Sequence, residues 1–80
     1  MLFRSGEVHD DGRIWSQALW TINRDLGHER ADKIILNAQI NFPGTTMVDL
    51  ANRTVAMAKI LYDNATATKV RAAFQARGIL

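Results

Sequence analysis

Two histidines are the residues of this sequence whose protonation state is easiest to tune near neutral pH. His28 opens the segment His28-Glu29-Arg30-Ala31-Asp32, the first half of the zinc-binding pattern H-E-x-x-H. That pattern needs a second histidine four residues later on the same helix face, and Asp32 stands there instead. Because no third protein ligand is apparent and Glu29 and Asp32 suit an acidic first helical turn, the segment favours a helix start over a metal site.

His9 lies in the polar segment Gly6-Glu7-Val8-His9-Asp10-Asp11-Gly12. One interpretation is an exposed loop histidine without a function. Another is a positioned hydrogen-bond donor whose charged form is favoured by the carboxylates of Asp10 and Asp11. The residues alone leave both interpretations open.

Composition narrows the class of protein. The chain has 80 residues, of which 48% are hydrophobic and 22% charged, and it contains no cysteine. This is typical of one small folded domain without disulfides. The formal charge is +2 and the basic residues are scattered, which argues against a nucleic-acid partner. No apolar run reaches the roughly 18 residues of a membrane span, so we expect no membrane partner.

Helices must position these residues, because no segment alternates apolar and polar residues as a strand does. We predict an all-α fold, a small bundle of about four helices. The domain should span 1–80, with an irregular lead-in at 1–11 and helices over 12–80. The first predicted helix follows residue 12 and stops at Gly27. The second runs over 29–40, the third runs over 47–62, and the fourth continues from the turn at 63–66 to Gly78.

Apolar spacing indicates how the helices face one another. The first helix has one stripe, made by Ile14, Trp15, Ala18, Leu19, Ile22 and Leu26. Trp20 falls on the opposite side, so this helix is either sandwiched between two layers or leaves an indole exposed. The second helix has apolar residues on two sides, including Leu36 and Ile40, which predicts that it is the central helix.

A connection and a helix cap are predicted between the second and third helices. Pro43 disfavours helix at the preceding residue and Gly44 tolerates many backbone angles, so residues 41–46 should form the longest loop. Thr46 followed by Asp49 resembles a capping box, which predicts that the third helix begins at Met47.

The segment from Glu7 to Trp20 resembles the opening of the C-terminal helical subdomain of fungalysin-type zinc metallopeptidases, which are relatives of thermolysin. The family pattern has a Val-His pair, a glycine, Ile/Val-Trp, an alanine and Leu-Trp, and EVHDDGRIWSQALW supplies most of it. The segment from Phe74 to Gly78 resembles the C-terminal motif of the family, so the resemblance covers about residues 6–80. Arg13 departs from the pattern, because an acidic residue is common there.

The resemblance implies that the chain is the C-terminal domain of a secreted zinc metalloendopeptidase, a fragment of a larger protein that forms one wall of the active-site cleft. It assigns to His9 stabilisation of the oxyanion formed during peptide-bond hydrolysis, a contribution of about 3 kcal/mol at comparable sites. The chain lacks H-E-x-x-H and the later glutamate ligand, so we expect no metal or cofactor in it and no activity in isolation. Zinc, and calcium as a second candidate, would belong to the parent enzyme. The implied partners are its catalytic N-terminal domain and a peptide substrate.

An alternative from another class is a non-catalytic helical module that binds a protein partner. Trp20 motivates it, because a large apolar group off the main stripe is favoured when another surface covers it. Under both interpretations the isolated domain has an uncovered face. We therefore expect it to form a homodimer.

Overall fold

Four α-helices make up most of the part of the chain that the structure describes. The computed structural model describes residues 8–40, 44 and 46–80, with the side chains of residues 8–11 excepted. The helices are α1 (Val8–Leu26), α2 (His28–Gln39), α3 (Met47–Leu61) and α4 (Asn64–Ala76). No strand occurs in these ranges, which confirms the predicted all-α class. Most of the predicted loop at 41–46 lies outside the described residues.

Side-chain caps fix the starts of α3 and α4. The Thr46 hydroxyl accepts a hydrogen bond from the Asp49 N–H at 3.0 Å, which confirms the predicted cap. Asp63 caps α4, and its carboxylate accepts from the Thr66 N–H at 2.8 Å and from the Thr66 hydroxyl at 2.6 Å. These bonds hold the pKa of the Asp63 carboxyl below its ordinary value of 3.8, chiefly through the hydroxyl and then through the N–H.

Glycines with positive φ end two helices. Gly27 has φ 91° between α1 and α2, and Gly78 has φ 74° after α4. A residue with a Cβ is disfavoured at such angles, so glycine permits the abrupt change of chain direction. Both stops were predicted from the sequence.

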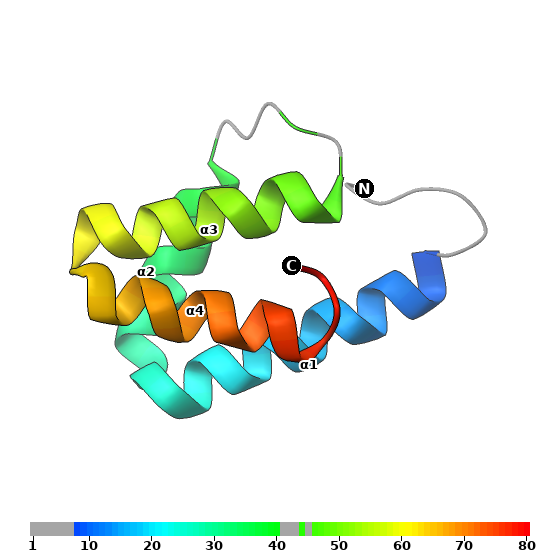
Figure 1. Ribbon diagram of the computed structural model, residues 1–80, viewed down its shortest axis with the longest axis horizontal. Coiled ribbons are helices and arrows are strands. Elements are labelled where there is room, and N and C mark those ends of the chain that lie inside the picture. The colour runs from blue at the N-terminus through cyan, green and yellow to red at the C-terminus, as the bar shows by residue number, and fades with distance from the viewer. Residues whose placement is uncertain (1–7, 41–43, 45) are drawn as a thin grey trace.

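The helices form a closed ring. Each packs against the helix that follows it in the chain, and α1 also packs against α4. The α3 and α4 helices run side by side and antiparallel, joined by the tight turn at the left of the view in Figure 1. This pair forms one wall of the bundle.

The core lies inside this ring. Its centre is a stacked pair, Trp15 of α1 and Phe74 of α4, whose ring centroids are 5.1 Å apart with an interplanar angle of 22°. Small residues allow the helices to approach closely, because Ala18, Ala38 and Ala58 are fully buried. The predicted stripe of the first helix faces this core, with Trp15, Ala18 and Ile22 buried and Ile14, Leu19 and Leu26 packed against them.

The start of the first helix differs from the prediction. Residues 8–11, expected to belong to an irregular lead-in, lie in α1. The sequence predicts a boundary at Gly12, but a glycine inside a helix costs only about 1 kcal/mol relative to alanine and does not force a start there.

The prediction that the second helix is central is wrong. Helix α2 packs against α1 and α3, and its other side faces outward with Leu36 at 62% and Ile40 at 52% exposure. Apolar residues on two sides of a helix allow both sides to be covered by neighbouring helices, but they do not require it. In a ring of four helices, each helix keeps one side that faces outward.

Arg53 ties the end of α2 to α3. Its Nε donates to the Ala38 carbonyl at 2.7 Å, and its Nη2 donates to the Ile40 carbonyl at 3.0 Å. Carbonyls at the C-terminus of a helix have no partner within the helix, so a guanidinium with several donors can satisfy two of them at once.

None of the helices within the described ranges is at once long enough and apolar enough to cross a bilayer.

Candidate functional site

His9, the predicted catalytic residue, is the second residue of α1. The backbone there is helical and not a loop. Its side chain lies outside the described part of the chain, as do those of Asp10 and Asp11. In helical register, position 9 shares a face with positions 13 and 16, and the side chains of Arg13 and Ser16 are exposed. The functional assignment of His9 stays a prediction.

His28 takes the helix-start position that the sequence favoured. It is the first residue of α2, its Nε2 lies 3.0 Å from Asp32 Oδ2, and its Nδ1 lies 3.3 Å from Asn23 Oδ1. The Asn23 amide nitrogen donates to the Leu19 carbonyl, which leaves its oxygen to face the imidazole. Through these two contacts, His28 links the end of α1 to the first turn of α2.

The described residues do not form a metal site. His28 and Asp32 form a pair at an 83% exposed imidazole. Across residues 12–40, 44 and 46–80, no three histidine, aspartate or glutamate side chains come together as a set of metal ligands. Zinc sites take three or four ligands of these kinds, and the described residues offer no such set.

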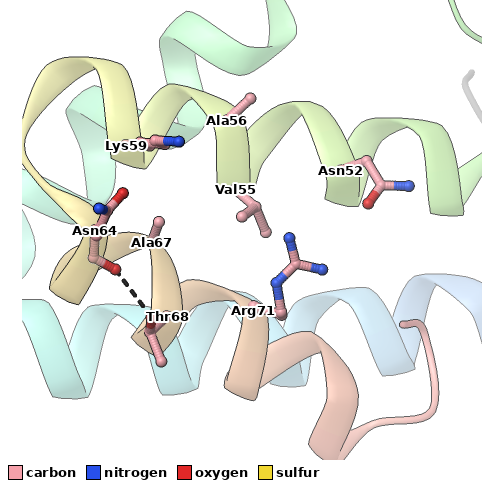
Figure 2. Close-up of a pocket in the computed structure, with 8 residues that line it drawn as sticks. All are labelled: Asn52, Val55, Ala56, Lys59, Asn64, Ala67, Thr68 and Arg71. Carbon is pink, nitrogen blue, oxygen red and sulfur yellow. Dashed lines mark hydrogen bonds between the residues drawn. The ribbon is translucent and has the colours of Figure 1, made fainter.

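A groove lies between α3 and α4 on the outer side of this pair (Figure 2). Its volume is about 400 Å³, which is within the range of small ligand sites. Eight residues line it, four from each helix: Asn52, Val55, Ala56 and Lys59, and Asn64, Ala67, Thr68 and Arg71. Val55 and Ala67 are buried and form its floor.

The two helices contribute to the groove with the same spacing and similar residue types. Each supplies an asparagine, then residues three and four positions later that are small or β-branched, and a cation seven positions later. Because the helices are antiparallel, Lys59 lies near Asn64 at one end and Arg71 lies toward Asn52 at the other, as Figure 2 shows. The groove therefore has an approximate two-fold arrangement of cation and amide.

The charge of the groove is positive. No carboxylate lines it, and neither Lys59 nor Arg71 pairs with an acidic group among the described residues. The Asn52 and Asn64 side-chain amides have no hydrogen-bond partner in that same part of the chain. The Thr68 hydroxyl donates to the Asn64 carbonyl at 2.9 Å, so its oxygen can still accept.

Large apolar side chains are exposed elsewhere. Trp20 is 61% exposed, with the guanidinium of Arg24 over its ring at 5.2 Å, so the exposed-indole alternative is the one observed. Leu36 also borders a hollow of about 310 Å³ on the outer side of α2, with Asp32, Ile35 and Gln39. Val48 and Ile60 on α3 add to this set.

Sequence reasoning missed the groove. The signal was available, since N-x-x-V-A-x-x-K at 52–59 and N-x-x-A-T-x-x-R at 64–71 share one pattern. The shared pattern indicates a groove only when the two segments are known to pack antiparallel. Antiparallel packing places the cation of one segment near the asparagine of the other.

Comparison with known proteins gives a similarity in sequence and none in family model or solved structure. No protein-family model matches the chain, and no solved structure matches it. Gelatinase from Enterococcus faecalis is 32% identical over 79 residues, an alignment that covers 96% of this chain and 16% of that protein. Nearly the whole chain is thus similar to a short segment of a gelatinase.

Proposed function

We propose that the chain is the C-terminal helical domain of a secreted zinc metalloendopeptidase, in which it forms one wall of the active-site cleft. The observation that carries the proposal is the similarity to gelatinase, which extends over 96% of the chain and is not confined to one motif. The name of that protein denotes a protease, and the resemblance of residues 7–20 to fungalysin-type enzymes points to the same class.

His9 is the residue of this domain that would act on the substrate. When water attacks a peptide carbonyl, negative charge develops on the carbonyl oxygen. A histidine N–H directed at that oxygen stabilises the charge more in the transition state than in the ground state, and so accelerates the reaction. The register of α1, which places position 9 on the side of the exposed Arg13 and Ser16, is compatible with a histidine that faces another part of an enzyme.

Metal binding would belong to a different part of the enzyme. Among the described residues, no three histidine, aspartate or glutamate side chains gather as metal ligands. The zinc ligands, the general base and most of the substrate pocket would come from the catalytic N-terminal domain, which we propose as the partner of this chain. The domain would be inactive without it.

A chimera tests this function without relying on the docking of separate fragments. The matching segment of the Enterococcus faecalis gelatinase is replaced by this chain, and gelatin cleavage is measured for the chimera, for His9→Ala and for His28→Ala. Loss of one oxyanion donor should lower kcat by about 100-fold or more with little change in KM. His28→Ala is the matched control, because it removes a histidine outside the proposed site.

Two results would overturn the proposal. One is a chimera that is folded and loaded with metal but does not cleave gelatin. The other is a His9→Ala chimera that keeps full activity, which would remove the catalytic role of His9 even if the domain assignment held.

A second candidate function is supported by the exposed apolar residues. Trp20, Leu36 and Ile40 are each more than half exposed. Under this alternative the chain is a non-catalytic interaction module whose apolar surface binds a protein partner or a second copy. Sedimentation equilibrium tests the dimer: a monomer at high concentration would contradict self-association, and a dimer dissociated by Leu36→Asp would support it.

A further inference from the structure

We propose that the groove between α3 and α4 binds an extended acidic peptide segment that has two carboxylates three residues apart. The occupant is inferred from charge complementarity, because two cations line the groove and no carboxylate does. This inference does not rest on the proposed peptidase function. His9 lies on α1, outside the pair of helices that forms the groove.

Spacing of the cations sets the spacing of the carboxylates. In each helix the asparagine and the cation are seven residues apart, which corresponds to about 10 Å along the helix axis. Since the helices are antiparallel and Lys59 lies near Asn64 (Figure 2), the positions of Lys59 and Arg71 are offset along the helix axes by about the same 10 Å. A peptide in the extended polyproline II conformation advances about 3.1 Å per residue with three residues per turn, so acidic residues at i and i+3 lie on the same side of it, about 9 Å apart.

Amide and apolar groups suit the remainder of a peptide. The Asn52 and Asn64 side chains each offer a donor and an acceptor, which can pair with a peptide N–H and C=O. Val55 and Ala67 give a shallow apolar floor between the two ends, where the two intervening residues of the ligand would lie. Arg71 can hold a carboxylate with two parallel hydrogen bonds, and Lys59 acts as a point charge.

The same geometry disfavours other anions. Two cations whose positions are offset by about 10 Å along the helices match two separated carboxylates better than one phosphate group. Nucleic acid is bound by extended clusters of basic residues, and this groove has one cation at each end.

Peptide titrations test the proposal on the intact chain. The probe is the blocked hexapeptide Gly-Asp-Ala-Ala-Asp-Gly. Its comparison is the isomer Gly-Asp-Asp-Ala-Ala-Gly, which has the same composition and charge but adjacent carboxylates. Binding is followed at low salt by amide chemical shifts, since screening weakens exposed ion pairs. We expect the first peptide to shift amides of α3 and α4 and to bind about fivefold more tightly than its isomer.

Variants separate the groove from overall charge. Arg71→Gln and Lys59→Gln should each weaken binding by about tenfold, the scale of a lost charge-assisted hydrogen bond. Lys33→Gln on α2 removes the same charge outside the groove and should change affinity by less than about twofold. Ala56→Leu fills the groove without changing charge, and it should also weaken binding.

Several outcomes would overturn the inference. Equal affinity for the two isomers would show that the groove does not recognise the spacing of the two carboxylates. If Lys33→Gln weakened binding as much as Arg71→Gln and Lys59→Gln, the binding would depend on net charge and not on the groove. The inference also fails if no amide of α3 or α4 shifts at about 1 mM peptide. Tighter binding of inorganic phosphate or heparin, weakened by the same variants, would replace the peptide with a general anion.

Discussion

Helices α4 and α2 use their apolar residues in different ways. In α4, Ala67, Val70, Ala73 and Phe74 are buried against the other helices of this chain. In α2, Ala31, Ile34 and Ala38 are buried, whereas Leu36, and Ile40 at the C-terminal cap of the helix, face outward.

The two helices differ in how far this chain itself covers their apolar residues. The apolar set of α4 is covered by the chain itself, and its outward side carries polar and cationic groups. The outward side of α2 carries large apolar groups that gain stability when another surface covers them. We therefore propose a protein partner or a second domain for the α2 side. For the α3–α4 side we propose a polar ligand.

The largest expected effect is at the centre of the core. Phe74→Ala should destabilise the fold by about 3–5 kcal/mol, because it removes a buried ring that stacks on Trp15 and leaves a cavity. A small domain has a free energy of unfolding of similar size, so we expect loss of the cooperative thermal transition in circular dichroism. Phe74→Leu is the control and should keep a transition at lower temperature. A Phe74→Ala variant that melts like the parent would contradict the assignment of the core.

Arg53 of α3 holds the end of α2 against the bundle through its bonds to the Ala38 and Ile40 carbonyls. Arg53→Ala should lower the free energy of unfolding by about 1–2 kcal/mol through loss of two hydrogen bonds to carbonyls. Urea denaturation measures this change. Arg53→Lys keeps the charge but not the fork of donors, and it should recover less than half of the loss.

The two helix caps should respond differently to acid. The pKa of Asp63 is lower in the folded state than in the unfolded chain, so its stabilisation is present above the unfolded value and is lost as pH falls through the folded pKa. Asp63→Ala should therefore lower Tm at pH 7 and remove part of the decline in Tm below about pH 4. Thr46→Ala is the matched variant, because its hydroxyl cap is uncharged and its effect on Tm should not depend on pH in this way. Parallel pH profiles for Asp63→Ala and Thr46→Ala would contradict this account.

The smallest expected effect is on the outward side of α2. Leu36→Ala should change the free energy of unfolding of the monomer by less than about 0.5 kcal/mol, since the side chain is 62% exposed. Urea denaturation at low protein concentration measures it. A loss above 2 kcal/mol would mean that Leu36 is covered in solution, and dilution would then show whether a second copy covers it.

Local signals predicted much of the fold. The stripe of α1, the stops at Gly27 and Gly78 and the cap at Thr46 depend on residues near one another in sequence, and the structure has each of them. The outward position of α2 and the matching ends of the groove depend on which helices are neighbours, and periodicity within one helix carries no such information. The role of His9 depends on groups that would lie in another domain, so this chain alone could not determine it.

The ring arrangement also has a consequence for folding kinetics. Packing of α1 on α2, α2 on α3 and α3 on α4 joins segments that are consecutive in sequence, whereas α1 on α4 joins the two ends of the described chain. Contacts between consecutive segments form quickly, and contacts across a long loop form more slowly. The Trp15–Phe74 stack spans this last junction, so the fluorescence of Trp15 should report the closing step of the ring.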